Sequence, residues 1–405
     1  MLALKRFNWV ETVQHKRPTI ADVAQTAGVS IGTVSNYING TATVKDTTRE
    51  RIEKAISDLT YRPSAIARAL PGHGRRKSKD LDGLPRLLVV GHISVDFLCR
   101  VNVLPHRDDR ITAEHIDKAL GGPAANVAVA AAGVGAPCSL DVELATAVGD
   151  DPDSDWALGE LLKRGVHALP IKRSITNRLS QAIVIIERNG SRTIISEPFE
   201  LSDGDLTANM DVQKEARPAC LHIEGSQYES MIGSVERFHR AGWKVSMHSA
   251  GLPDTSRTPT AFTELVQLVD LTFINDVTLR EIFGYRTPLA TMIGQAHDTL
   301  SKIKRRGDVV VTLGEFGAVV FPKSGGPQIE VPALLVDRID ATGAGDSFAG
   351  IFLAFWLHGA SLEQAACYAA IGGSLTTTVE GAQGHIAGFE ELKAALPVNR
   401  TAAAR

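Results

Sequence analysis

The strongest constraint on the fold is an alternation of short apolar runs with helical segments, which begins at Arg86 and continues toward the C-terminus. The runs hold few polar residues, as is typical of strands that are buried on both faces. Such strands, when helices separate them, predict a parallel sheet covered by helices and therefore an α/β fold. The runs lie at residues 87–90, 220–223, 244–247, 271–274 and 309–313.

Two segments do not follow this pattern. Residues 96–120 form a polar, alternating stretch, and residues 182–186 and 192–195 are typical of a hairpin that turns at Asn189-Gly190. Alternation places apolar side chains on one face of a strand and polar ones on the other. We therefore expect a small second sheet with one face open to solvent.

A glycine-rich turn at residues 340–350, DATGAGDSFAG, leads into an apolar helix that we expect to end near Leu357. Gly343 and Gly345 leave backbone N–H groups bare, and Asp346 falls in the first turn of the helix. Free N–H groups and the positive end of the helix dipole both favour phosphate, and a carboxylate there could accept a proton from an attacking hydroxyl. The stretch is neither a Walker A loop nor GxGxxG. It indicates phosphoryl transfer, with plain helix capping as the alternative.

This motif and a second one, GGPAANVAVAAAGVGA from Gly121, resemble the two signatures of the ribokinase-like (PfkB) carbohydrate kinases. The resemblance implies a ribokinase-like three-layer α/β/α domain whose small β-sheet forms a lid over a sugar substrate, with ATP as the phosphoryl donor. It also implies that Asp346 is the catalytic base and that Gly343, Ala344 and Gly345 line an anion hole. Such a hole stabilises the charge that develops on the transferred group.

The same resemblance assigns the sugar site to Asp96, Gly121, Gly122 and Asn126. Two adjacent glycines allow the backbone to approach a ligand closely and to act as a hinge. Asn126 offers both a donor and an acceptor to sugar hydroxyls. Asp96, in GHISVDF, aligns with the substrate-binding Asp of the family, with a turn-capping role as the alternative.

The nucleotide site is implied by three weaker matches. The segment TLGEFG resembles the family's loop beside ATP, and Gly381-Ala382 resembles its Gly-Ala pair near the adenine. Asn275 matches the first residue of the family's Asn-x-x-Glu, whose Glu helps to organise magnesium. Thr278 replaces that Glu, so Asp276 or another acid could hold Mg²⁺ through water, or catalysis could be weak. The cofactors implied are ATP and Mg²⁺, with the metal ligands unknown. The nucleotide-binding residues expected are Asn275, Thr312, Gly314, Gly317, Gly381 and Ala382.

The N-terminal segment carries the opposite charge to the rest of the chain. Residues 1–85 hold 14 Lys and Arg against 8 Asp and Glu, net +6, which leaves 29 against 38, net −9, for residues 86–405. This asymmetry is a pointer to nucleic acid. Helices are expected from Thr19, from Ser30 and from about Asp46, with Gly28 in the first tight turn, and three helices so arranged are typical of a helix-turn-helix unit.

Residues 18–70 resemble the DNA-binding headpiece of LacI-type repressors, including the hinge helix at 64–70. The resemblance implies a double-stranded DNA operator and, because one headpiece reads few base pairs, a homodimer. Asn36 could pair with an adenine edge, and Leu70 matches the wedge that such proteins insert into the minor groove. A plain three-helix packing unit is the alternative. The DNA-binding residues expected are Ser30, Ile31, Gly32, Thr33, Ser35, Asn36 and Leu70.

Five segments follow from these patterns: a flexible leader at 1–17, the helix-turn-helix and hinge at 18–70, a basic linker at 71–85, the kinase domain at 86–397 and a flexible tail at 398–405. No apolar run approaches the roughly 20 residues that span a bilayer. The four cysteines are scattered and lack metal-site spacing. We expect a cytoplasmic protein without a membrane partner.

The sugar and the mode of action stay open at this point. Residues 172–198 resemble kinases of ketohexoses and of sulfofructose, while ribose, sugar acids and nucleosides are alternatives. Arg173, Arg178 and Arg192 could meet an anionic substrate. The chain is either an active ATP-dependent sugar kinase joined to its own transcriptional regulator, which Asp346 favours, or a regulator whose weak or inactive kinase fold senses sugar or nucleotide, which Thr278 favours.

Overall fold

The computed structural model describes residues 18, 20–39, 44–59, 61, 83–174, 178–188, 191–198 and 204–396. The chain divides into two compact units, Met1–Arg68 and Ala69–Arg405. The expected leader, hinge helix with Leu70, linker through residue 82, hairpin turn at Asn189-Gly190 and tail lie outside the described residues. Within the part of the chain that is described, no helix is long and apolar enough to cross a membrane.

The first unit contains the three predicted helices, α1 (Ile20–Ala27), α2 (Ile31–Asn39) and α3 (Asp46–Asp58). Gly28 takes a left-handed φ of 62° between α1 and α2, a conformation that costs glycine little. Arg51 of α3 donates to the carbonyls of Ala27 and Gly28, which ties the third helix to this turn. The apolar side chains face one another in a small core made of Val23, Ala24, Ala27, Val34, Ile52, Ala55 and Tyr61.

The second unit is built on a large sheet, which has nine strands among the described residues, in the order β13-β12-β11-β10-β9-β8-β1-β4-β5. Its pairings from β11 to β5 are parallel, as predicted, and β12 and β13 add an antiparallel edge. The strands are β1 (Arg86–Val90), β4 (Asp141–Gly149), β5 (His167–Ser174), β8 (Ala219–Glu224), β9 (Lys244–His248), β10 (Leu271–Asn275), β11 (Asp308–Thr312), β12 (Ala318–Phe321) and β13 (Ile329–Val331).

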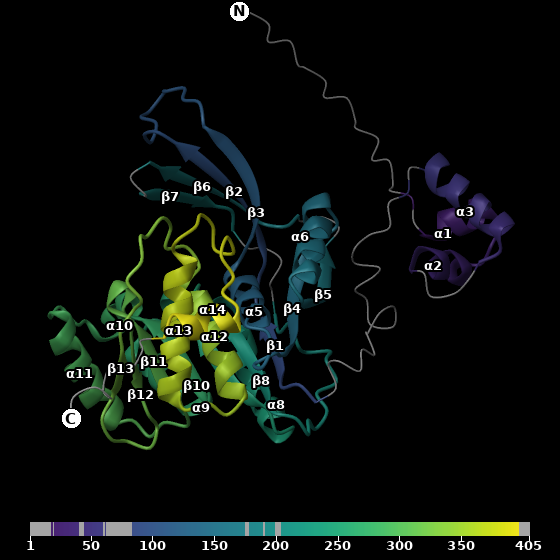
Figure 1. Cartoon of the computed structure of the whole chain (residues 1–405). Helices are drawn as coiled ribbons and strands as arrows, with labels where there is room; N and C mark the ends of the chain where they lie inside the picture. The colour runs from purple at the N-terminus through teal and green to yellow at the C-terminus, as the bar shows by residue number, and fades with distance from the viewer. Residues whose placement is uncertain are drawn as a thin grey trace, which may run out of the picture. The chain divides into compact units, whose positions relative to one another are not determined.

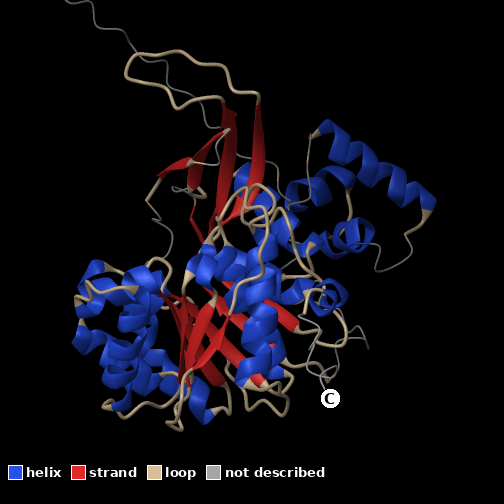
Figure 2. Cartoon of the chain, turned by 60° about the vertical axis from the view of Figure 1, so that its left-hand side comes forward, coloured by secondary structure: helices blue, strands red, loops and turns tan. Residues whose placement is uncertain are grey.

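Helices cover both faces of this sheet (Figures 1 and 2). Successive residues of β10 show the two layers, because Phe273 packs edge-on against Phe352 of α12 whereas Ile274 joins a core with Leu279 of α10. One layer holds α5 (Pro123–Gly133), α12 (Ala344–Leu357), α13 (Leu362–Thr376) and α14 (Phe389–Ala394). The other holds α7 (Tyr228–Met231), α8 (Val235–Arg240), α9 (Pro259–Leu268), α10 (Asp276–Phe283) and α11 (Leu289–Ser301), while α6 (Pro152–Lys163) lies beside β5.

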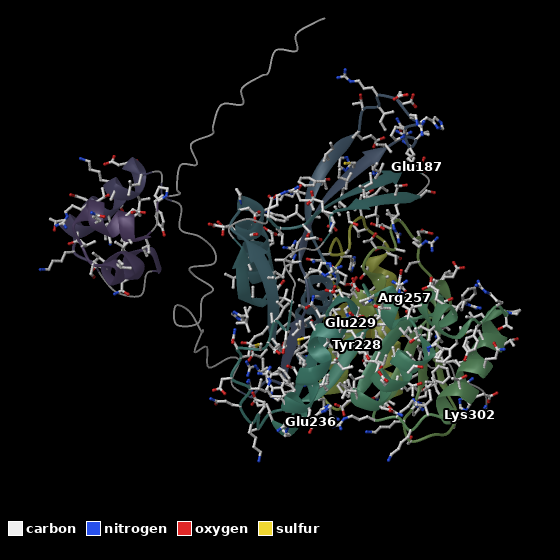
Figure 3. All side chains as sticks on the ribbon, turned by 180° about the vertical axis from the view of Figure 1, so that it is seen from behind. Glu187, Tyr228, Glu229, Glu236, Arg257 and Lys302 are labelled. Carbon is white, nitrogen blue, oxygen red and sulfur yellow. The ribbon has the colours of Figure 1, made fainter. Side chains whose placement is uncertain are left out.

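A separate sheet of four described strands, ordered β3-β2-β6-β7, stands above the large sheet and is named the lid (Figure 1). It contains β2 (Ser94–Val101), β3 (His115–Gly121), β6 (Gln181–Glu187) and β7 (Arg192–Ser196), so the predicted hairpin is present. Seen from behind, Glu187 marks the lid, whereas Tyr228, Glu229 and Lys302 mark the helical layer around the large sheet (Figure 3).

The two faces of the lid differ in burial. Leu98, Val184 and Ile186 are buried on one face. On the other, Ile116, Ile183 and Ile195 are 62%, 43% and 58% exposed. The open face is therefore apolar at several positions, where a polar one was expected.

Candidate active site

Polar side chains gather where the parallel strands end, because the carboxyl ends of such strands meet at one edge of the sheet. Glu224 and His248 close β8 and β9 as register partners, and Asn275 and Thr312 do so on β10 and β11. His92 follows β1 nearby and contacts Glu224. This edge lies below the lid (Figure 1).

Asp346 lies in the first turn of α12, as predicted, behind Gly343, whose φ of 75° begins the helix. Its side chain is 14% exposed and receives a hydrogen bond of 2.9 Å from Nδ2 of Asn126 to Oδ2. Nε2 of His248 lies 3.7 Å from the other carboxylate oxygen, Oδ1. Burial raises the pKa of Asp346, and His248 and the Asn126 hydrogen bond counteract that rise. The carboxylate is thus held by neighbours that stabilise its charged form.

Asn126, expected to contact sugar, is occupied on both sides of its amide. Nδ2 donates to Asp346, and Oδ1 accepts a 2.9 Å hydrogen bond from Nε2 of Gln383. The residue is 6% exposed at the start of α5. Its geometry is that of a support for Asp346, with one N–H left for a ligand.

The other residues expected at the sugar site come together at the base of the lid. A side-chain Cβ on Gly121 would lie 2.3 Å from both carboxylate oxygens of Asp96, so glycine is required for this approach. Gly122 has a φ of 98°, and a Cβ there would lie 2.5 Å from the carbonyl oxygen of His92. Asp96 accepts a hydrogen bond from the Ser94 hydroxyl, and burial raises the pKa of its carboxyl.

The expected anion hole and adenine segments also meet. A Cβ on Gly343 would lie 2.5 Å from that of Ala382. Asp340, which is 3% exposed, links the two segments, because it accepts hydrogen bonds from the backbone N–H groups of both Thr342 and Gly381. A phosphate at the start of α12 would therefore be flanked by the loop that carries Gly381.

Asn275 and the loop after β11 form the remaining part of the expected nucleotide site. Oδ1 of Asn275 caps α10 by accepting the Thr278 N–H at 2.7 Å, and Thr278 is 7% exposed. Asp276 lies 3.6 Å from Arg280. Gly314 and Gly317 take φ values of 60° and 92° and shape the turn that follows Thr312.

The sequence leaves the ligands for a magnesium ion unassigned. The described segments contain no group of three or more His, Cys, Asp or Glu side chains that could hold a metal ion. The buried side chain of Thr278 offers a metal less than the expected carboxylate would, and Asp276 is already paired with a cation.

Sequence reasoning missed one buried acid, Glu224, and one buried base, His248, at this edge, and also the salt bridges of the lid. Glu224 is fully buried and accepts hydrogen bonds from the N–H groups of His92 and Ala124. Arg192 of β7 lies 3.4 Å from Asp340, and Arg100 of β2 pairs with Glu380. A polar residue that ends an apolar strand was the available signal for both missed side chains.

The three arginines expected near an anionic group have different surroundings. Arg192 reaches Asp340 at the site, as described above. Arg178 instead pairs with Glu197. The side chain of Arg173 lies outside the described residues.

In the first unit, the residues expected to read DNA lie on α2 and at its start. Ile31 is 52% exposed on the same helix as the fully buried Val34, so a large apolar side chain points outward there. Ser30, Gly32 and Asn36 are exposed and Thr33 is half-buried. The side chain of Ser35 lies outside the described residues.

Comparisons with known proteins separate the two units in the same way. Residues 84–387 match the family described as "pfkB family carbohydrate kinase", and residues 19–64 match "Bacterial regulatory proteins, lacI family". An ATP-dependent ribose-1-phosphate kinase of Halopiger xanaduensis is 26% identical over 298 residues, 74% of this chain and 94% of the relative. The HTH-type transcriptional repressor PurR of Vibrio campbellii is 52% identical over 58 residues, 14% of this chain and 17% of the repressor. The structure of Arabidopsis thaliana ribokinase with ribose and ATP, 24% identical, gives a TM-score of 0.61 over 78% of this chain and all of the other.

Proposed function

The chain belongs to the pfkB family of carbohydrate kinases and carries a lacI-family DNA-binding domain at its N-terminus, and from this premise we propose which residues act and on what. The protein is an ATP-dependent carbohydrate kinase joined to a transcriptional regulator module. The observation that carries the assignment of roles is the position of Asp346, at the start of α12 and hydrogen-bonded to Asn126.

In the proposed reaction a sugar hydroxyl oxygen attacks the γ-phosphorus of ATP. The bond to the β-phosphate oxygen breaks, ADP leaves, and Asp346 accepts the hydroxyl proton. Backbone N–H groups of Gly343, Ala344 and Gly345 stabilise the charge on the transferred phosphoryl group. Asn126 holds the carboxylate in place, and Gly381 and Ala382 border the nucleotide together with Asn275, Thr312, Gly314 and Gly317.

The proposed substrate is a ribose-type five-carbon sugar, which Asp96 binds through two hydroxyl groups beside Gly121 and Gly122. Support comes from relatives named for ribose-1-phosphate, deoxyribose and ribose. The close fit of Gly121 against Asp96 leaves both carboxylate oxygens near the hinge of the lid. A panel that includes ketohexoses, sulfofructose, sugar acids and nucleosides separates this class from the alternatives.

Magnesium is proposed to enter with the nucleotide. Mg²⁺ usually binds through one or two carboxylates together with substrate phosphates. Thr278 stands where the family's Glu is expected. Without that Glu, the only acid in residues 275–278 is Asp276. The metal would neutralise phosphate charge, and the chain's own groups would orient the sugar.

For the N-terminal domain we propose sequence-specific binding of a palindromic double-stranded operator by a homodimer. Ser30, Ile31, Gly32, Thr33, Ser35 and Asn36 would face the major groove, and Leu70 the minor groove. The exposed isoleucines of the lid at 116, 183 and 195 supply an apolar surface on which a second copy could pack. The proposed boundaries remain 1–17, 18–70, 71–85, 86–397 and 398–405, with a cytoplasmic location.

The deciding experiment measures ADP release with ATP, magnesium and the sugar panel, comparing the protein with Asp346→Asn. This substitution keeps the size of the side chain and removes the base, so turnover should fall by at least about a hundredfold while the fold is retained. If Asp346→Asn released ADP with the preferred sugar at the wild-type rate, Asp346 would not be the catalytic base.

A second candidate function is a regulator in which the kinase fold senses its ligands with little turnover. The buried Thr278 and the Asp276–Arg280 pair favour it, because the segment lacks a free carboxylate for the metal. Saturable binding of sugar and nucleotide without ADP release, in the wild-type protein, would support this alternative.

A further inference from the structure

A buried pair of histidines lies behind Asp346 and takes no part in the transfer as proposed so far. His222 of β8 is fully buried, and His248 at the end of β9 is 5% exposed. Their ring planes are nearly parallel, with an interplanar angle of 7° and centroids 4.9 Å apart. Nε2 of His222 lies 2.9 Å from Nδ1 of His248, and Nδ1 of His222 lies 2.8 Å from the Ser246 hydroxyl. The two imidazoles thus form a fixed chain that starts at Ser246.

The free end of this chain points at the proposed base. Nε2 of His248 is shielded from solvent and makes no hydrogen bond within the described part of the protein. It lies 3.7 Å from Oδ1 of Asp346, just beyond hydrogen-bonding distance. A buried polar atom without a partner destabilises the folded protein. A small movement of either side chain would give His248 the partner that it lacks.

The positions of the hydrogen atoms decide in which direction Ser246 and the two histidines donate. Burial lowers the pKa of both histidines, so each is neutral and carries one N–H. If His248 donates to His222, its Nε2 presents a bare lone pair to the Asp346 carboxylate, which is repulsive. If His222 donates to His248, the N–H on Nε2 faces the carboxylate, and Ser246 donates to His222.

The second arrangement gives each donor of the chain an acceptor. The Cys220 thiol donates to the carbonyl oxygen of Leu221 at 3.4 Å and lies 3.2 Å from the Ser246 hydroxyl oxygen, so the Ser246 hydroxyl hydrogen can go to His222. The donors then run in one direction, from Ser246 through both histidines to Asp346. The negative charge on Asp346 selects this arrangement over the reverse.

We propose that His248 is a positioning residue for the base, and that its Nε2–H, fixed by His222 and Ser246, closes on Oδ1 of Asp346 in the catalytic state. The inference rests on the proposed role of Asp346. Together with Asn126 on Oδ2, it would place one donor on each carboxylate oxygen and thereby fix the direction in which the base accepts a proton. It would also keep the buried carboxylate ionised at neutral pH.

Other charged groups also act on Asp346. His92, after β1, favours the ionised carboxylate, and Glu224, at the end of β8, opposes it. Both remain in place when His248 is replaced. Because His248 also lowers the pKa of Glu224, the comparison with His248→Gln, which keeps a donor, separates loss of the donor from an effect through Glu224.

The test is the pH profile of kcat/KM for ADP release in His248→Phe, His222→Phe and a control, His297→Phe, on α11 outside the site. Loss of the donor raises the pKa of Asp346, so the acid limb of the His248→Phe profile should move upward by about one pH unit. His222→Phe should move it less, because His248 remains, and His297→Phe should leave it unchanged. His248→Gln, which keeps an amide N–H, should shift the acid limb less than His248→Phe does.

A purely structural role would lower the rate equally at all pH values, and an unmoved acid limb in His248→Phe would overturn the inference. If the Phe variant does not fold, His248→Leu carries the same test with a smaller side chain. Asp346→Asn separates the two levels. If Asp346→Asn is active, Asp346 is not the base. If Asp346→Asn is inactive and the acid limb of His248→Phe does not move, only the proposed role of His248 is wrong.

Discussion

Asn126 of α5 donates a 2.9 Å hydrogen bond to Asp346 of α12, and this bond joins the helix behind the lid hinge to the helix that carries the proposed base. The two helices can come close because Gly350 has no side chain, and a Cβ there would lie 2.4 Å from the carbonyl oxygen of Val127. The start of α5, beside the proposed hinge, and the proposed base are thus held by two helices that pack together. Gly122 lies one helical turn before Asn126, whose backbone N–H donates to the Gly122 carbonyl. A ligand that changes the conformation of Gly122 would therefore act close to Asn126.

Replacement of Asn126 by Ala should reduce kcat/KM by about 10- to 100-fold, because a hydrogen bond to a charged group contributes about 1.5–3 kcal/mol. ADP release at saturating ATP measures the change. Gln383→Ala is the matched comparison, since Gln383 contacts Asn126 and has no described hydrogen bond to Asp346. Its loss should be the smaller of the two. Equal losses would show that the amide of Asn126 has no direct effect on the base.

Replacement of Arg192 by Gln should weaken closure of the lid on the site. The Arg192–Asp340 pair joins β7 to the loop before α12, and the Arg192 side chain is 36% exposed. A pair of this exposure contributes at most about 1 kcal/mol, so we expect the KM for sugar to rise by about two- to fivefold. Arg188→Gln is the control, because Arg188 pairs with Glu114 within the lid region and is 72% exposed. A KM that rises equally in both variants would contradict the role of the pair.

Replacement of Gly317 by Ala should destabilise the kinase domain more than Gly314→Ala. Both glycines have positive φ, which costs a residue with a Cβ about 1–2 kcal/mol. A Cβ on Gly317 would in addition lie 2.0 Å from the backbone oxygen of Val331, whereas Gly314 has nothing within 4 Å. Urea unfolding, followed by circular dichroism, measures the difference. Similar midpoints for the two variants would show that β13 can move aside at little cost.

Operator affinity should depend on the state of the kinase domain. A ligand that binds two conformations unequally by about 1–3 kcal/mol changes the affinity at a coupled site about 5- to 150-fold. Titration of DNA with and without sugar, nucleotide and both tests this, at one fixed salt concentration because phosphate contacts are salt-dependent. Asp96→Ala should keep the ligand-free affinity and lose the response to sugar. Four identical affinities in the wild-type protein would mean that the domains are only tethered.

The parts of the site that could be predicted are those whose chemistry is local in sequence. Asp346 and Gly343 lie within a few residues of each other, and their turn-helix geometry follows from that spacing. The contact of Gly343 with Ala382 joins segments about 40 residues apart, and the sequence indicated both segments without showing that they touch.

His248 and Glu224 could not be found in this way. Each is a single polar residue at the end of an apolar strand, and they meet only because β8 and β9 are neighbours in register. β4 was missed for another reason, since Asp141 and Glu143 make its first half look unlike a buried strand. Glu143 is tolerated there because Arg86 of the adjacent β1 neutralises it.

The parallel pairing of β2 with β6 sets the order in which the molecule can assemble. The lid strands that pair lie more than 80 residues apart in the sequence, and α5, β4, α6 and β5 all occur between them. Closing so long a loop is entropically costly until the intervening segment has become compact. The lid should therefore gain protection from amide hydrogen exchange after the strands beneath it. A chain still emerging from the ribosome at β5 would already hold Asp96 and the paired strands β2 and β3, but not the β6–β7 half of the lid.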